Sequence, residues 1–155
     1  MFVLRKLVFG RNESNLAEFN DKEYVSNPFV SKITQLKVWS DYEFVYGVQA
    51  FYSMQDMFDI AGEEHIKPEM LAKVRNISSI EIEPDDQIAE ISGKYSEGIT
   101  YLQVRTQKGI VKEFGTDRDC GDQFTVSFGP KETLAMLHGA FCEMKGMIIK
   151  LKAFI

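Results

Sequence analysis

The chain has 155 residues, 45% of them hydrophobic and 26% charged, proportions that are typical of soluble globular domains. A single domain of this length buries roughly 70% of its unfolded surface, so we expect one domain over residues 1–155 with a core that needs neither disulfides nor a metal. The formal net charge is −5, and no third of the chain is basic enough to bind nucleic acid, while no apolar run reaches the roughly 18 residues of a membrane span.

The N-terminal residues 1–11 are basic but contain no uninterrupted apolar stretch like that of a secretory signal. We therefore expect a protein of the cytoplasm or of an intracellular assembly. Cys120 and Cys142 are too few for a disulfide framework, and both are expected to be reduced. Residues 1–8 are expected to add an outer strand or to dock on a neighbouring chain.

Alternation of apolar and polar residues is the strongest signal along the chain, and it predicts half-buried strands. Residues 11–23 read as a polar loop. The alternating segments that follow are residues 33–38, 45–52, 77–82, 88–91, 99–105, 124–128 and 147–154. Short turn signals separate them, so the spacing predicts an all-β sandwich or barrel-like fold.

Residues 54–76 do not fit this alternation, because they begin polar and acidic. Pro68 suits the first turn of a short helix, and a helix would place Met70, Leu71 and Val74 on one side. A long connection that crosses a sheet is the alternative interpretation.

A faint repeat links three of the predicted strands. They share the template Ile-x-x-(Leu/Ile)-x-(Val/Ile), which begins at Ile33, Ile77 and Ile99. The intervals of 44 and 22 residues are unequal, which excludes a solenoid. The repeat favours related hairpins that pack around a common axis.

The sequence offers few groups for catalysis or metal binding. His65 follows Glu63 and Glu64, and we expect an exposed acidic loop there, since these ligands do not complete a tetrahedral shell. His138 and Cys142 are four residues apart. If this stretch is a strand, the two lie roughly 13 Å apart, which is too far for a catalytic pair. No glycine-rich phosphate-binding motif occurs. We therefore expect no enzyme, no metal site and no cofactor.

Two groups of turn residues are candidate ligand sites. The carboxylates at Asp85–Asp86 and Asp117–Asp119 lie in predicted turns, where aspartate is favoured for its hydrogen bonds to the backbone. Trp39 and Tyr42 flank another turn. Either ring could stack on a ligand, although packing at a sheet edge is the commoner role.

The order of these segments resembles the jacalin-type lectin domain. The similar segments are residues 33–40 with 47–52, 77–82 with 87–95, 99–106 with 109–116, and the tail 137–151. The resemblance implies a β-prism of three four-stranded antiparallel sheets with pseudo-threefold symmetry. It also implies a shallow, metal-free pocket for mannose- or galactose-type sugars, to which Gly10, Tyr95 and Gly146 correspond as carbohydrate-binding positions.

The sequence departs from this family at one acidic residue of the implied pocket. The family's late G-x-x-x-D motif supplies an Asp that accepts hydrogen bonds from two sugar hydroxyls. This chain has Lys150 there when the motif is aligned on Gly146. A lysine side chain does not accept those bonds, so the usual pocket is expected to be degenerate.

Two functions follow from these observations. The main interpretation is a non-enzymatic module that acts as a protein-interaction or structural subunit, with protein partners in an oligomer or larger assembly. The alternative is a lectin that binds glycans through an altered pocket.

Overall fold

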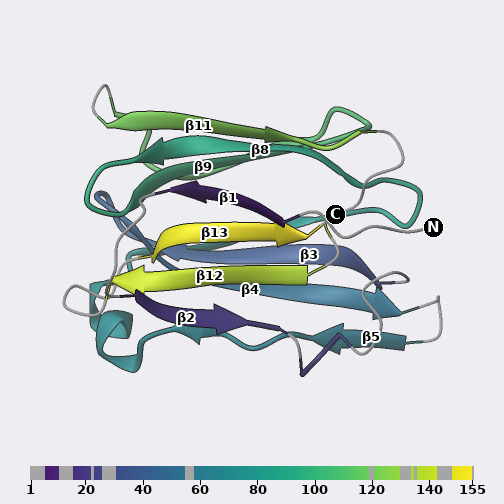
Figure 1. Cartoon of the computed structure of the whole chain (residues 1–155), viewed down its shortest axis with the longest axis horizontal. Helices are drawn as coiled ribbons and strands as arrows, with labels where there is room; N and C mark the ends of the chain where they lie inside the picture. The colour runs from purple at the N-terminus through teal and green to yellow at the C-terminus, as the bar shows by residue number, and fades with distance from the viewer. Residues whose placement is uncertain are drawn as a thin grey trace.

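The protein is a three-sheet β-prism, seen in Figure 1. The computed structural model describes residues 6–10, 16–21, 23–25, 31–54, 58–118, 121–129, 134, 136–142 and 148–154. In the first sheet the order is β1 (Lys6–Gly10), β13 (Ile148–Phe154), β12 (Met136–Cys142) and β2 (Leu16–Asn20). All of its pairings are antiparallel.

The other two sheets come from the middle of the chain. One has the order β5 (Phe58–Ala61), β4 (Val45–Met54), β3 (Ser31–Ser40) and β7 (Asn76–Glu81), and the short β6 (His65–Ile66) also pairs with β4. The other has the order β10 (Val111–Gly115), β9 (Ile99–Thr106), β8 (Ile88–Tyr95) and β11 (Asp122–Ser127). The expected all-β prism is therefore confirmed, and β6 is an addition to its middle sheet.

Apolar side chains from the sheets form one core in the interior of the prism. Val45, Tyr52, Ile99 and Phe114 are among its most deeply buried members. At the borders of the sheets, β1 contacts β11, and β10 contacts β3 and β7. No helix among the described residues is long and apolar enough to cross a membrane.

The residues of the repeated template are buried differently in β3 and β7. Positions one and four of the template have opposite parity, so a regular strand cannot bury both. In β3 the register shifts between Ile33 and Gln35, and Ile33 returns to the core. No shift occurs in the pairing of β7 with β3, and Ile77 is exposed while Ile80 is buried.

Two expectations for the polar segments are wrong in part. Residues 11–23 are not all loop, because Leu16–Asn20 forms the edge strand β2. Pro68 does begin a helix, but it is a 3₁₀ helix, η1 (Pro68–Lys73). Its repeat is three residues per turn rather than 3.6. Met70 is buried, whereas Leu71 is exposed.

The N-terminal segment 1–8, the His138–Cys142 pair and Cys120 are described only in part. Residues 6–8 lie in β1 at the edge of the first sheet, and residues 1–5 are outside the described part. His138 and Cys142 both lie in the strand β12, where a spacing of four residues corresponds to roughly 13 Å. Cys120 is outside the described residues.

The turn after β7 confirms the structural role that was expected for Asp86. Its side chain is buried, and its Oδ1 accepts hydrogen bonds from the backbone N–H groups of Gln87 (2.8 Å) and Lys108 (3.1 Å). Burial raises the pKa of this carboxyl group, but hydrogen bonds from Thr106, Gln87 and Lys108 outweigh burial and hold the pKa below its ordinary value.

Asp86→Asn is expected to lower the free energy of unfolding by about 1–2 kcal/mol at neutral pH, since it weakens hydrogen bonds to a charged acceptor. The folded pKa is below the unfolded value of about 3.9. The ionised group therefore stabilises the fold above that value, and this stabilisation is lost as the pH falls through the folded pKa. Urea unfolding at decreasing pH should show the gap between wild type and variant closing below about pH 4.

Asp85→Asn is the control, because Asp85 is exposed and pairs with Lys108 at the surface. This change should alter stability little. A gap between wild type and Asp86→Asn that stays constant with pH would contradict the role given to the Asp86 charge.

Candidate functional site

The positions implied by the sequence resemblance are only partly described. Gly10 is the last residue of β1, and its cross-strand partner is Lys150 of β13. This pairing puts the glycine of the implied pocket opposite a residue that cannot replace the family's Asp. Gly146 and the connections 11–15 and 143–147 lie outside the described residues.

Tyr95, the third implied position, ends strand β8. Its ring lies 6.2 Å from that of Phe124, and the half-buried side chain packs against the core. The neighbouring Lys94 pairs with Asp117 at 2.5 Å and donates to the carbonyl of Arg118. The structure thus shows Tyr95 engaged by the core on at least one side.

A different pocket lies at one end of the prism. Strands β1, β8 and β12 all end there, on the left in Figure 1. We call it the turn-end pocket, and it has a volume of about 300 Å³. It lies between the turn that joins β3 to β4, the start of β7 and the end of β10. Its lining residues are Ser40, Asp41, Tyr42, Arg75, Asn76, Gly115 and Thr116.

Asp41 fixes the shape of the β3–β4 turn. Its Oδ1 accepts hydrogen bonds from the backbone N–H groups of Glu43 (2.7 Å) and Phe44 (2.8 Å). Its Oδ2 accepts one from the hydroxyl of Tyr46 at 2.8 Å. Burial, this hydrogen bond and the nearby charge of Asp41 raise the pKa of Tyr46. A carboxylate has about four acceptor positions, so Oδ2 keeps one for another donor.

The next residue, Tyr42, presents its ring to solvent. The side chain is 77% exposed, whereas its neighbour Trp39 is only 4% exposed. Of the two aromatic residues weighed at this turn, Trp39 therefore belongs to the core, and Tyr42 is available to a ligand. Sequence alone did not separate them.

Arg75 forms the opposite side of the pocket. Its backbone N–H donates to the carbonyl of Ser40 at 2.9 Å, which ties the residue after η1 to the end of β3. Its Nη1 donates to the carbonyls of Ala72 (3.2 Å) and Val74 (3.3 Å). Among the residues that the structure describes, no carboxylate forms an ion pair with its guanidinium group.

Gly115 brings the third segment close to the pocket. Its φ is +78°, and a Cβ there would lie 2.4 Å from the carbonyl oxygen of Thr100. The next residue, Thr116, donates its backbone N–H to the same oxygen at 3.1 Å. Farther along, Arg118 Nη2 donates to the carbonyl of Glu43 at 3.1 Å, so this connection also holds the β3–β4 turn.

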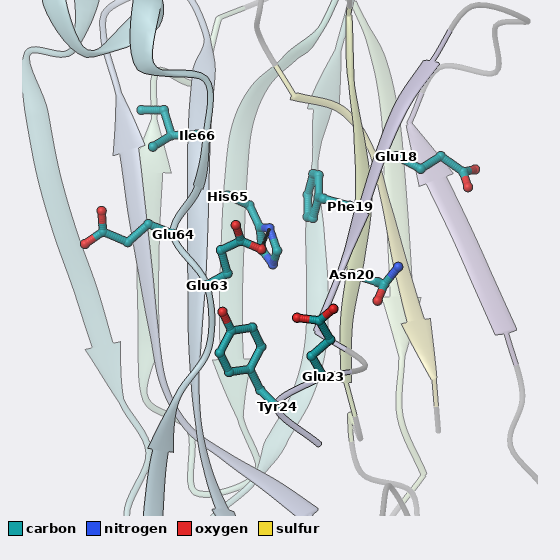
Figure 2. Close-up of a pocket in the computed structure, with 9 residues that line it drawn as sticks. All are labelled: Glu18, Phe19, Asn20, Glu23, Tyr24, Glu63, Glu64, His65 and Ile66. Carbon is teal, nitrogen blue, oxygen red and sulfur yellow. Dashed lines mark ion pairs between the residues drawn. The ribbon is translucent and has the colours of Figure 1, made fainter. Parts of the chain in front are cut away.

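A second hollow, of about 380 Å³, lies between β2 and residues 63–66, and we call it the acidic hollow. Glu18, Glu23, Glu63 and Glu64 line it together with Phe19, Asn20, Tyr24, His65 and Ile66. In Figure 2, Tyr24 and Glu23 extend toward Glu63 and His65 across the hollow. None of the lining residues is a lysine or an arginine.

His65 corrects the expectation of an exposed acidic loop. Glu63 and Glu64 are exposed, but His65 is buried, and its ring stacks on Phe19 with centroids 4.3 Å apart. Its Nε2 lies 2.5 Å from Oδ1 of Asp21. Its Nδ1 lies 4.0 Å from Oε2 of Glu63, and both of these side chains are drawn in Figure 2.

The buried carboxylate of Asp21 joins two sheets. Tyr52 of β4 donates its hydroxyl to Oδ2 of Asp21 at 2.5 Å, and His65 of β6 meets Oδ1. Asp21 follows directly after β2, so these bonds hold the first sheet against the middle one. The three residues are 31 and 44 positions apart, and no local motif could have paired them.

The described residues contain no group of three or more His, Cys, Asp or Glu side chains that could hold a metal ion. The turn-end pocket combines an exposed ring with polar groups, and the acidic hollow is built on a structural Asp–His pair.

Comparisons with known proteins agree with this fold. The profile of the Jacalin-like lectin domain matches residues 9–151. Frutapin, a lectin from Artocarpus incisa, superimposes with a TM-score of 0.73 at 14% identity, covering 99% of this chain and 97% of that one. The artocarpin–mannotriose complex gives 0.73 at 15%, covering 100% and 99%.

A mannose-specific jacalin-related lectin from Morus nigra, in complex with mannose, gives a TM-score of 0.72 at 12% identity and covers 99% of this chain and 95% of that one. At such identities these likenesses concern the fold. No curated protein sequence matches the chain.

Proposed function

Because the chain belongs to the jacalin-like lectin domain family, we propose that it binds carbohydrate and that the turn-end pocket is its saccharide site. The observation that carries this proposal is the exposed ring of Tyr42 at the rim of a pocket whose other groups are polar. Family membership makes a binding role the better supported function, and the chemistry of the pocket suits a sugar.

The pocket offers both kinds of contact that a sugar ring needs. The ring of Tyr42 is a flat apolar surface with a polar hydroxyl, suited to the C–H face of a hexose. The remaining acceptor position on Asp41 Oδ2, the amide of Asn76 and the hydroxyl of Thr116 suit sugar hydroxyls. A hydrogen bond to a carboxylate is roughly twice as strong as one between neutral groups.

Asp41 also provides a carboxylate in place of the Asp of the family's late G-x-x-x-D motif. The residue opposite Gly10 is Lys150, so that region does not supply the expected carboxylate from β13. Asp41 supplies a carboxylate from the β3–β4 turn. This turn lies at the same end of the prism as the end of β1 (Figure 1). The proposal thus moves the site from Gly10, Tyr95 and Gly146 to a neighbouring hairpin.

The first ligands to test follow from the structural neighbours. Artocarpin was solved with mannotriose and the Morus nigra lectin with mannose. Methyl α-mannoside and methyl α-galactoside, titrated into the purified protein up to millimolar concentration, cover the two expected sugar types. No binding of any saccharide would refute the proposed function.

Tyr42→Ala is expected to raise the Kd for the bound saccharide about tenfold, equivalent to about 1.4 kcal/mol. The change removes the ring but no core contact, because the side chain is 77% exposed. Isothermal titration calorimetry measures the effect. Tyr42→Phe keeps the ring and should keep most of the affinity; equal affinities for Tyr42→Ala and wild type would place the site elsewhere.

The role of a structural or protein-interaction subunit stays a prediction. The acidic hollow is a surface where a basic partner would fit, but nothing in the structure shows a partner there. Size-exclusion chromatography with light scattering on the full chain tests whether it forms an oligomer.

A further inference from the structure

Among the described residues, none partners one edge of the Arg75 guanidinium group. Within this part of the chain, its Nη1 alone forms hydrogen bonds, to the carbonyls of Ala72 and Val74. These carbonyls are neutral and do not balance the positive charge. The Nε–H and the two Nη2–H groups form no hydrogen bond with the described residues. This edge is a pair of parallel donors, the geometry that matches two oxygens of one carboxylate.

Asp41, the other charged residue of the pocket, already accepts hydrogen bonds on both of its carboxylate oxygens. Asp41 directs both oxygens into its own turn, where three donors meet them. It keeps one acceptor position, whereas Arg75 keeps three N–H groups. Of the groups that these two residues leave for a ligand, three are therefore N–H donors on a cation and one is a carboxylate acceptor position.

We propose that the turn-end pocket prefers an anionic saccharide, whose carboxylate or sulfate oxygens pair with the Nε–Nη2 edge of Arg75. This inference rests on the proposed function, and it names the class of sugar. A neutral hexose would use Tyr42 and the polar groups but would leave the guanidinium edge to water. An acidic sugar uses all of them.

The test compares ligands that differ only at C6. Methyl β-glucuronide has a carboxylate where methyl β-glucoside has a hydroxymethyl group, and the 6-sulfate of methyl β-glucoside separates sulfate from carboxylate as the source of the anion. Wild-type protein should bind the glucuronide about five- to tenfold more tightly than the glucoside. The preference should shrink as salt is raised, because the pair is exposed.

Variants assign the preference to one side chain. Arg75→Gln should bring the ratio of the two affinities close to one, and Arg75→Lys, which keeps the charge but not the paired donors, should give an intermediate ratio. Lys73→Gln is the matched control: Lys73 is exposed, lies two residues away and does not line the pocket. It should keep the wild-type ratio. Circular dichroism establishes that each variant is folded.

Each outcome separates the two proposals. If the wild type binds none of these saccharides, methyl α-mannoside and methyl α-galactoside included, the proposed function fails. If it binds any neutral sugar as tightly as the glucuronide or more tightly, carbohydrate binding stands and the anionic preference is refuted. If Arg75→Gln and Lys73→Gln lower the ratio equally, general surface charge and not the Arg75 edge sets the preference, and the assignment is overturned.

Discussion

Asp21→Ala is expected to lower the free energy of unfolding by about 3–5 kcal/mol, since each buried polar group left without its partner costs about 1–3 kcal/mol. The Asp21 side chain is fully buried and binds Tyr52 and His65, which belong to the neighbouring sheet. Without the carboxylate, two buried polar groups lose their partner. The seam between β2 and the middle sheet should open before the rest of the prism.

Urea unfolding followed by circular dichroism measures this loss, and hydrogen exchange locates it. Glu64→Ala removes an exposed carboxylate from the edge of the acidic hollow, and we expect a change within about 0.5 kcal/mol. If the two variants were equally stable, the Asp21 network would contribute nothing beyond an ordinary surface charge. Asp21→Asn, which keeps one acceptor oxygen, should lie between wild type and Asp21→Ala.

Gly115→Ala should cost about 2–5 kcal/mol, from two separate effects. A residue with a Cβ loses roughly 1–2 kcal/mol in the left-handed region, and the φ of Gly115 is +78°. Crowding in a packed region costs a further 1–3 kcal/mol or so, because the added Cβ would lie 2.4 Å from the carbonyl oxygen of Thr100. Thermal or urea unfolding reports the sum.

Gly109→Ala isolates the first effect. Its φ is +91°, but nothing lies within 4 Å of an added Cβ. This variant should therefore lose only about 1–2 kcal/mol. Equal losses at Gly109 and Gly115 would show that the close approach of β10 to Thr100 is not what requires a glycine.

Most of the strands were predictable because alternation is a local property. A side chain in a strand points to the face opposite its neighbours, so segments such as 45–52 and 99–105 show their buried faces in the sequence. Pro68 likewise marked the start of η1. The segment 16–20 was missed because β2 is a short edge strand in which the exposed Glu18 and Asn20 surround the buried Phe19.

The candidate site was less predictable. Tyr42 was identified as one of two rings at a turn, but only the structure shows that it is exposed while Trp39 is buried. The sequence does not indicate Arg75 as a residue of the site, since a single arginine after a short helix has no distinctive pattern. Gly10, Tyr95 and Gly146 came from the family resemblance, and as saccharide ligands they stay a prediction.

The sequence by itself determined most of the strands, the turns between them and the resemblance to the jacalin-type lectin domain. Each of these is carried by residue types at short, regular intervals. Only the tertiary structure decided that Asp21 joins His65 and Tyr52, and that Asp41, Arg75 and Gly115 line one pocket. These groups meet because sheet pairing brings distant segments together. The residue types within one segment do not indicate which distant segment it will contact.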